Sequence, residues 1–508
     1  MSSTGTTTMT TTGTTEGCDV VVVGGGNAGY SAALAAAEAG ARVCLLERAD
    51  HGHAGGNSYY TAGAFRCAFS GLAELRPLLE PDPRLQDTDL DAYTQDDFWD
   101  DMRRLTDGHC DETLTRVLIE DSGDAVRWLT GHGVRWRLMY ERQAYHRDGR
   151  WRFFGGLVVG TVDGGKGLVA QHVAAAERAG VTTRHDATVS DLSLDETGRV
   201  CGVEWYDEHG RRQVTTSGAV VLAAGGFEAS PAMRRRHLGP EWEQAVVRGN
   251  PLNTGELLEV AVGKGAARFG DWGSCHSVAW DVAGPAQGGD RTLTNRLTRQ
   301  SYPLGIVVNR EGRRFVDEGA DYRNYTYAKY GAEILRQPGA VAFQLFDAKT
   351  RPLLRTEEYD SEPITAASAD DLGELADRLG IDADGLEATV REFNDAILDQ
   401  PFDPAVKDGR SAAVTPPKSN WALALDTPPY HGFAVTCGIT FTFGGLRVDD
   451  RARVLRPAGE PIEGLYAAGE MVGGLFSGNY PGGTGLTSGT VFGRRAGRDA
   501  ARLTRARR

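Results

Sequence analysis

The stretch CDVVVVGGGNAGYSAALAAAEAGARVCLLE, residues 18–47, decides the fold class of this chain. An apolar run that ends at a glycine-rich turn is typical of a buried strand, and the Ala-rich segment after the turn has the pattern of a helix. The turn contains Gly24, Gly26 and Gly29 as GxGxxG, and a second apolar run ends at Glu47, 18 residues after Gly29. Together these features predict the βαβ unit that binds dinucleotides.

Each residue of this pattern has a physical role. Gly24 permits the turn, Gly26 lets the backbone approach a pyrophosphate, and Gly29 lets the helix pack against the strand. The first N–H groups of the helix are free to bind phosphate. Glu47 is placed to accept hydrogen bonds from a ribose, which disfavours the 2′-phosphate of NADP. The alternative is an ordinary glycine-rich turn between a strand and a helix.

Three later elements favour FAD over NAD as the dinucleotide. AVVLAAGGF (219–227) and GLYAAGE (464–470) have the pattern of strands that end in glycine, and GGTGLTSGT (482–490) has that of a Gly/Thr-rich helix start. The last element can direct N–H groups at the pyrimidine edge of a flavin, where negative charge develops on reduction. The sequence has no second GxGxxG, so we expect no built-in NAD(P)H domain.

The composition indicates an acidic globular protein of two or three domains. The chain has 508 residues, a formal net charge of −14 and 66 glycines. An acidic surface disfavours nucleic acid as a partner, and no apolar run reaches the roughly 18 residues of a membrane span. The seven cysteines lack CxxC or metal-ligand spacing. We therefore expect reduced thiols, no bound metal and a cytoplasmic location.

The pattern changes along the chain in a way that predicts an insertion. Residues 1–17 are a Thr/Gly-rich tract without an apolar segment, which we interpret as a disordered tail rather than a signal peptide. Segments 18–270 and 440–508 share the nucleotide-binding pattern, whereas 271–439 is aromatic, Gly-rich and irregular. We expect an α/β fold with an α+β insert: a Rossmann-like FAD-binding domain made of N- and C-terminal parts, with a second domain between them.

Several motifs resemble those of one flavoprotein family. VVVGGGNAG, ERADHGHAGGNS, VLAAGGF, VVNREGRRFVDE, FTFGGL and GLYAAGE are similar to the family of fumarate reductase, succinate dehydrogenase and 3-ketosteroid dehydrogenase. Through GIVVNREGRRFVDEGADYRNYTYAKYG, TCGITFTFGGL and GNYPGGTGLTSG, the chain looks most like the FAD-dependent tricarballylate dehydrogenase branch. The resemblance implies that 271–439 is a mobile capping domain, with substrate held between the two domains against the flavin N5.

The resemblance and the glycine-rich elements together give the FAD contacts that we expect. They are Gly24, Gly26, Asn27, Ala28, Gly29, Glu47, Arg48, Gly55, Gly56, Asn57, Ser58, Thr188, Val189, Ala224, Gly225, Gly226, Gly469, Glu470, Gly485, Leu486 and Thr487. In the succinate dehydrogenase branch a histidine bonds covalently to the flavin, and Asn57 falls at that position here. The resemblance therefore implies FAD that is bound non-covalently.

Four residues are candidates for catalysis through the same resemblance. Arg323 falls where fumarate reductases carry a proton-delivering arginine, and Tyr322 and Tyr480 fall near tyrosines of ketosteroid dehydrogenases. His276 lies near a substrate-binding histidine of the family. The alternatives are two surface loop residues at 322–323 and a structural histidine at 276. Phe441 and Tyr480 stand where the family's fumarate clamp has histidine and arginine, so simple fumarate or succinate is a poor match.

These residues predict an FAD-dependent dehydrogenase, or in reverse an ene reductase, that acts on the bond α,β to a carboxylate or carbonyl. Tricarballylate to cis-aconitate is the leading reaction, and a ketosteroid-like or specialised biosynthetic desaturation is the alternative. In the dehydrogenase direction we assign the base to Tyr322 or Tyr480, because arginine, with a pKa above roughly 12, is a poor base. A third possibility, from another class, is a flavin electron-transfer module without its own substrate.

Two further features concern partners. The sequence has no haem or Fe–S spacing, so we expect a separate electron donor or acceptor: a quinone, a redox protein, reduced flavin or O2. Six arginines between 135 and 152 can bind carboxylates over the cleft. The alternative for this basic stretch is a solvated hairpin.

Overall fold

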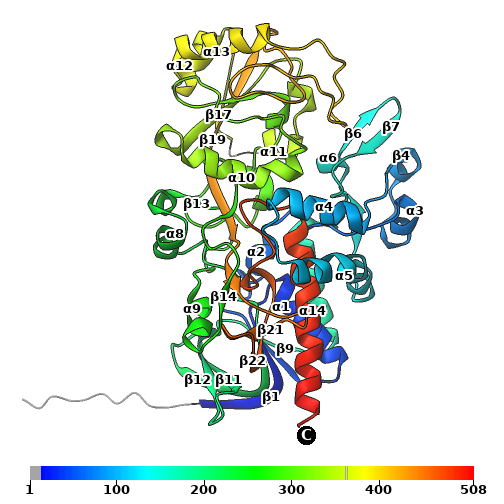
Figure 1. The fold of residues 1–508 in the computed structure, drawn as a ribbon, viewed down its shortest axis with the longest axis vertical. Coiled ribbons are helices and arrows are strands. Elements are labelled where there is room, and N and C mark those ends of the chain that lie inside the picture. Colours follow the sequence, from blue (N-terminus) through cyan, green and yellow to red (C-terminus); the bar gives the residue numbers. More distant parts are fainter. Residues whose placement is uncertain (1–12, 361, 363, 508) are drawn as a thin grey trace, which may run out of the picture.

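A computed structural model describes residues 13–360, 362 and 364–507 of the chain. Figure 1 shows an elongated molecule with one large sheet toward each end. The eight-stranded sheet includes the first described strand and the C-terminal helix packs against it, whereas the six-stranded sheet comes from the middle of the sequence. This mixed α/β architecture confirms the fold class that the sequence predicts.

The eight-stranded sheet contains the βαβ unit. Its central order is β10-β11-β12-β1-β2-β9, and β22 joins it parallel to the end of β12. Helix α1 (Asn27–Glu38) connects β1 to its parallel neighbour β2, as the sequence predicts. The strands are β1 (Gly13–Val23), β2 (Val43–Leu46), β9 (Thr182–Arg184), β10 (Thr188–Leu194), β11 (Val200–Tyr206), β12 (Arg212–Leu222), β21 (Arg453–Leu455) and β22 (Pro461–Ala467).

Strand β1 begins earlier than we expected. Residues 13–17, which we assigned to the disordered tail, belong to β1, where Gly13 pairs with Gln213 of the long strand β12. The error has a physical reason: Thr-rich segments suit strands, and β12 extends far enough to pair with this one. Residues 1–12 of the expected tail lie outside the described part of the chain.

The last helix, α14 (Thr484–Arg505), packs along α1 and brings the two ends of the chain together (Figure 1). Glycines permit this close approach. A Cβ at Gly497 would lie 2.1 Å from the Ala32 carbonyl oxygen, and one at Gly493 would lie 2.5 Å from that of Ala28. The N-termini of α1 and α14 consequently open toward the same region.

The six-stranded sheet is organised around the long strand β19. This strand pairs with β13, β15, β17 and β18, and β16 pairs with β17. Helix α10 (Arg323–Leu335) packs against β15 and β19. Helices α12 (Leu372–Leu379) and α13 (Ala383–Asp395) cover the outer end, and Leu386, Val390 and Phe393 lie in its core. The strands are β13 (Val246–Val247), β15 (Cys275–Asp281), β16 (Ile306–Val308), β17 (Val341–Phe346), β18 (Ala366–Ala369) and β19 (Tyr430–Thr442).

Shorter elements fill the remainder of the molecule. The other helices are α2 (Gly56–Tyr59), α3 (Leu72–Leu75), α4 (Gln95–Leu105), α5 (Glu112–Gly131), α6 (Tyr140–Gln143), α7 (Gly164–Arg178), α8 (Pro231–His237), α9 (Glu256–Gly263) and α11 (Thr356–Tyr359). The other strands are β3 (Ala64–Phe65), β4 (Thr88–Asp89), β5 (Trp136–Leu138), β6 (Ala144–Arg147), β7 (Arg150–Phe153), β8 (Val159–Thr161), β14 (Arg268–Phe269) and β20 (Gly445–Leu446). The domain limits at 270 and 439 stay a prediction.

Candidate functional site

A cavity of about 450 Å³ lies where the two large sheets meet. One part is lined by the turns after β1, β2, β12 and β22 and by the N-termini of α1 and α14. Another part is lined by residues of β15, β19 and α10. Ligands of open α/β sheets bind outside the carboxyl ends of the strands, and the first part of this cavity occupies that position.

The glycine turn after β1 has the backbone geometry that the sequence predicts. Gly24 has φ +103°, and a Cβ there would lie 2.3 Å from the Ala223 carbonyl oxygen. A Cβ at Gly29 would lie 1.8 Å from the carbonyl oxygen of Gly24, so this glycine lets α1 pack against the turn. Gly26 caps α1 and lines the cavity. The helix N-terminus therefore faces a space that can receive phosphate.

Asn27 ties three helices together beside this turn. Its Nδ2 donates to the Leu486 carbonyl oxygen at 2.8 Å and to Thr490 Oγ1 at 3.1 Å, both on α14. Its Oδ1 accepts a hydrogen bond from His172 Nε2 of α7 at 2.9 Å, and its backbone N–H donates to Ser58 Oγ at 2.9 Å. Burial lowers the pKa of His172 to about 3, so the imidazole is neutral. Asn27 thus holds the two N-termini that open on the cavity.

The carboxylate of Glu47 lines the cavity at the end of β2. Its Oε2 accepts from the Gly25 N–H at 2.5 Å, and its Oε1 accepts from the Ala49 N–H at 2.9 Å. These bonds fix its orientation, and each oxygen keeps a lone pair that can accept from a ribose hydroxyl. Arg48 also lines the cavity and donates to Thr254 Oγ1 at 2.8 Å.

Asn57, predicted at the position of a flavin-bonding histidine, also lines the cavity. Its Nδ2 donates to Glu228 Oε1 at 2.6 Å and to the Thr440 carbonyl oxygen at 2.9 Å. Burial raises the pKa of Glu228 well above its usual value, and the neighbouring carboxyl of Glu470 adds to this effect. Burial also raises the pKa of Glu470, so the protonated form is favoured at this pair of carboxyl groups. Sequence reasoning missed Glu228, although it lies only two residues after the predicted Gly225-Gly226 pair.

Most of the predicted FAD contacts line this one cavity. They are Gly24, Gly26, Asn27, Ala28, Glu47, Arg48, Gly56, Asn57, Ser58, Thr188, Val189, Ala224, Gly225, Gly469, Glu470, Gly485 and Leu486. Gly29, Gly55, Gly226 and Thr487 lie behind the wall. A Cβ at Gly226 would lie 2.1 Å from Glu470 Oε1, and Thr487 Oγ1 donates to the Arg66 carbonyl oxygen at 2.8 Å. These four residues therefore support the wall rather than face the cavity.

The part of the cavity near β15 and β19 is aromatic. The His276 ring lies 4.9 Å from Tyr327, 5.2 Å from Phe441 and 5.0 Å from Tyr480, measured between ring centroids. The Tyr327 and Tyr480 hydroxyl oxygens are 2.6 Å apart and share a hydrogen bond. Burial raises the pKa of both phenols, so each keeps its proton. Tyr327 was not predicted; its position one helical turn after Arg323 was the available signal.

His276 is buried in this aromatic group without a polar partner. Neither ring nitrogen forms a hydrogen bond within the part of the chain that the structure describes. Burial lowers the pKa of His276 well below its usual value, and the Arg248 guanidinium adds to this effect. A neutral imidazole with two unsatisfied nitrogens, in a residue that lines a cavity, is suited to a polar ligand rather than to a purely structural role.

Arg323 and Tyr322 are adjacent in sequence but point to different places. Arg323 lines the cavity, and its guanidinium forms no hydrogen bond or ion pair with any described residue. Tyr322 precedes α10 and lies outside the cavity wall, stacked on Phe154 at 5.3 Å, with its hydroxyl donating to the Ala405 carbonyl oxygen at 3.4 Å. The structure therefore brings Arg323, Tyr480 and His276 together but not Tyr322.

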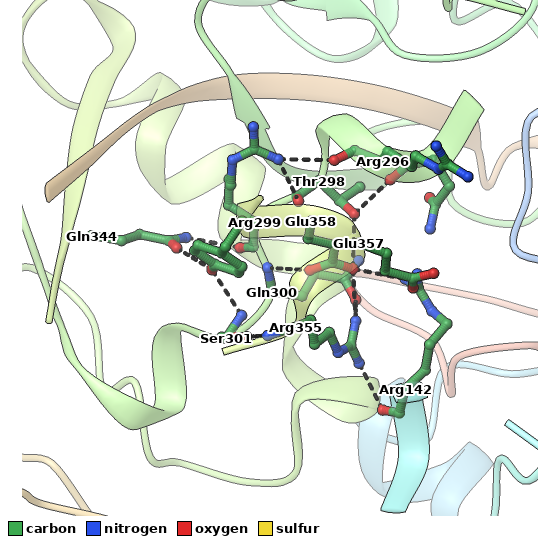
Figure 2. Close-up of polar contacts among 12 residues, drawn as sticks. Arg142, Arg296, Thr298, Arg299, Gln300, Ser301, Gln344, Arg355, Glu357 and Glu358 are labelled. Atoms are coloured by element: carbon green, nitrogen blue, oxygen red, sulfur yellow. Dashed lines mark hydrogen bonds and ion pairs between the residues drawn. The ribbon is translucent and has the colours of Figure 1, made fainter. Parts of the chain in front are cut away.

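The basic stretch 135–152 contributes one arginine, Arg142, to the cavity wall. Figure 2 shows Arg142 beside Glu357 and Glu358 of α11; its Nη2 lies 2.9 Å from Glu358 Oε1. Arg355 donates to the same Glu358 oxygen at 2.7 Å. The remaining arginines of the stretch lie outside the wall, and several of them belong to the β6–β7 hairpin. The hairpin interpretation therefore fits most of this stretch.

The chain is a dinucleotide-binding protein, because its βαβ unit and two helix N-termini face one cavity. The polar groups without partners lie in the part of this cavity near β15 and β19, and they suit a substrate. The family model described as FAD binding domain matches residues 19–486, so the chain belongs to this family. The chain is 29% identical over 491 residues to fumarate reductase (cytochrome) of Shewanella frigidimarina, covering 96% of this chain and 77% of that protein.

Other similar proteins are dehydrogenases. 4-Oxocyclohex-2-ene-1-carboxylate 5-dehydrogenase of Sinomonas cyclohexanicum is 30% identical over 368 residues, covering 68% of this chain and 60% of that protein. A crystal structure of 3-ketosteroid delta1-dehydrogenase from Sterolibacterium denitrificans, in complex with 1,4-androstadiene-3,17-dione, shares the fold with a TM-score of 0.74 at 22% identity. That match covers 96% of this chain and 100% of that one.

These findings confirm the predicted family, the fold class and FAD as cofactor. The chain is an FAD-dependent oxidoreductase of the fumarate reductase and ketosteroid dehydrogenase family, which acts on carbon–carbon bonds. Among the described helices, none has the length and apolar character needed to cross a membrane. Within the same residues, no group of three or more His, Cys, Asp or Glu side chains is arranged to hold a metal ion. The tricarballylate branch and the cytoplasmic location stay predictions.

Proposed function

We propose that this enzyme exchanges a hydride with the bond α,β to a substrate carboxylate or carbonyl, in a reaction of the tricarballylate dehydrogenase type or its reverse. One observation carries the proposal: the buried Arg323 guanidinium, which lacks an acidic partner among the described residues, lines the same cavity as the predicted FAD contacts. A buried cation without a counter-ion is costly, so an anionic or strongly polarised substrate group stabilises it.

When bound, FAD supplies the two-electron chemistry by accepting a hydride from the β-carbon in dehydrogenation or returning it in reduction. The protein must then remove or supply the α-proton. Arg323 stabilises the negative charge that develops on the substrate carbonyl or carboxylate oxygen. Tyr480 donates a hydrogen bond or a proton, and Tyr327 holds the Tyr480 hydroxyl in place through their 2.6 Å contact.

The protonation states of the cavity side chains favour donation of a proton to the substrate, as reduction requires. The raised pKa values keep Tyr327 and Tyr480 protonated, and arginine is cationic at physiological pH. For dehydrogenation, the neutral imidazole of His276 can accept a hydrogen bond from the substrate, but burial and the Arg248 guanidinium lower its pKa and make it a weak base. Since Tyr322 lies outside the cavity, we do not retain it as the base. The electron donor or acceptor is a separate molecule: a quinone, a redox protein, reduced flavin or O2.

A ketosteroid-like reaction is the second candidate, and the hydrogen-bonded phenols of Tyr327 and Tyr480 favour it because a phenol can polarise a ketone. The unpartnered Arg323 favours a carboxylate instead. A flavin electron-transfer module without a substrate would not need either feature.

Anaerobic titration of the oxidised and the reduced holoenzyme tests these candidates. We expect tricarballylate, a simple enoate or a related acid to change the flavin oxidation state, and a ketosteroid to act poorly. Arg323→Ala and Tyr480→Phe should each lower turnover about 100- to 10,000-fold while FAD content is retained. Tyr206→Phe, which changes an exposed tyrosine, is the matched control. If Arg323→Ala and Tyr480→Phe both keep the wild-type rate, this site assignment is wrong.

A further inference from the structure

The buried arginines differ in whether they have an acidic partner. In the described chain, Arg66, Arg142, Arg299, Arg314 and Arg355 each form an ion pair with an Asp or Glu. Arg234 has no such pair, but it donates to three backbone carbonyl oxygens outside the cavity. Arg248 and Arg323 remain, and both line the cavity. Five of these eight buried arginines are therefore neutralised by a carboxylate and Arg234 is satisfied by backbone carbonyl groups, whereas Arg248 and Arg323 have no acidic partner among the described residues.

Arg248 follows the short strand β13 and is 6% exposed. Its backbone N–H donates to the Ile439 carbonyl oxygen at 3.0 Å, which fixes the residue beside β19. Its Nη1 donates to Thr440 Oγ1 at 3.0 Å, and its Nη2 donates to Asn295 Oδ1. Both partners are uncharged, and a guanidinium has five N–H donors, so most of its donor capacity is unused.

The surroundings of Arg248 favour an incoming anion. The Arg248 guanidinium lies 5.9 Å from the centre of the Trp280 ring, and neutral His276 shares the cavity wall with it. The carboxylate of Glu358 favours the Arg248 cation from a distance, but its ion pairs are with Arg142 and Arg355. Arg142 itself adds positive potential on the same side. A substrate anion is therefore the missing counter-charge.

We propose that Arg248 binds a carboxylate group of the substrate and so selects acids over their neutral analogues. This inference rests on the proposed function and names the substrate class more closely: a carboxylic acid bound as its anion. The sequence has Tyr480 where the family's clamp arginine is expected, and Arg248 supplies the positive charge from a different segment, directly after β13. Thr440 and Asn295 hold the guanidinium in place before the ligand arrives, which lowers the entropic cost of binding.

Binding to the oxidised holoenzyme tests this inference apart from turnover. The probes are tricarballylate and the matched pair cinnamate and cinnamamide, and the readout is the perturbation of the flavin absorption band. We expect the wild type to bind an acid more tightly than the neutral amide. Arg248→Gln should weaken acid binding about 100-fold and leave cinnamamide binding unchanged, and Arg248→Lys should recover part of the loss. Arg296→Gln, which removes an exposed charge on the segment that carries Asn295, is the control.

The outcomes separate this inference from the proposed function. If the acids bind in an Arg248-dependent way but none is oxidised or reduced, the proposed reaction fails and the carboxylate site stands. If Arg248→Gln and Arg248→Lys keep FAD and bind the acids as the wild type does, the inference is overturned. It is also overturned if the wild type binds neither acid. With an active substrate, Arg248→Gln should raise KM much more than it lowers kcat, whereas Arg323→Ala should lower kcat.

Discussion

Acidification should destabilise the fold through His172, because this histidine is buried in its neutral form. Burial lowers the pKa of His172 to about 3, and an unfolded histidine has a pKa of about 6.5. Between these values the unfolded state binds a proton that the folded state does not, so stability falls as the pH falls below about 6.5. Between neutral pH and pH 5, protonation of His172 in the unfolded state therefore lowers the free energy of unfolding by about 2 kcal/mol.

The local geometry explains why the folded state resists the proton. His172 Nε2 donates to Asn27 Oδ1, and the buried Nδ1 has no partner among the described residues. A charged imidazole would carry an N–H at Nδ1 without an acceptor, beside the residue that holds α1 against α14. The buried, unpartnered His276 acts in the same direction. Acid should therefore weaken the fold near the FAD contacts.

Urea unfolding of the holoenzyme at a series of pH values, followed by circular dichroism and flavin fluorescence, measures this effect. His172→Gln keeps a donor for Asn27 Oδ1 and removes the titrating group. The variant should lose about 2 kcal/mol less stability than the wild type between pH 7 and pH 5. His209→Gln changes an exposed histidine and is the matched control. If His172→Gln and the wild type lose the same stability over this range, the assignment of a neutral buried His172 is wrong.

Two further predictions concern the cofactor. Gly29→Val should yield protein with little or no bound FAD, because even a Cβ at this position would lie 1.8 Å from the Gly24 carbonyl oxygen. The control is Gly263→Ala, in a helix with open space at its Cβ, which should keep its full FAD content as measured by absorbance. Acid precipitation of the wild type should leave FAD in the supernatant, because Asn57 has no nucleophilic nitrogen to bond the flavin; yellow pellets would contradict non-covalent binding.

The nucleotide-binding half of the site could be predicted because its signals are local. The turn at Gly24, the helix packing at Gly29 and the acidic residue Glu47 all follow from the geometry of one βαβ unit, and such a unit is contiguous in sequence. The start of β1 was missed for the opposite reason. Residues 13–17 become a strand only because β12, some 200 residues later, offers a partner. A polar Thr-rich segment carries no such information on its own.

The substrate half depends on segments that are distant in sequence. Tyr327 and Tyr480 share one hydrogen bond although 153 residues separate them, and Arg248 is fixed by partners on β19 and near Asn295. Neither pairing leaves a periodic or motif signal. Adjacent residues can also mislead: Tyr322 and Arg323 belong to the same motif, yet the start of α10 sends one side chain to the cavity and the other outside its wall.

Charge compensation gives information that the motif cannot. A motif comparison finds the clamp histidine and arginine replaced by Phe441 and Tyr480, and alone it argues against simple fumarate or succinate as the substrate. The structure contains other buried cations, and most are neutralised by Asp or Glu. Because Arg248 and Arg323 line one cavity without an acidic partner among the described residues, an anionic ligand bound there would stabilise the protein. On the inference argued above, the loss of the expected clamp residues changes where a carboxylate binds rather than whether one binds.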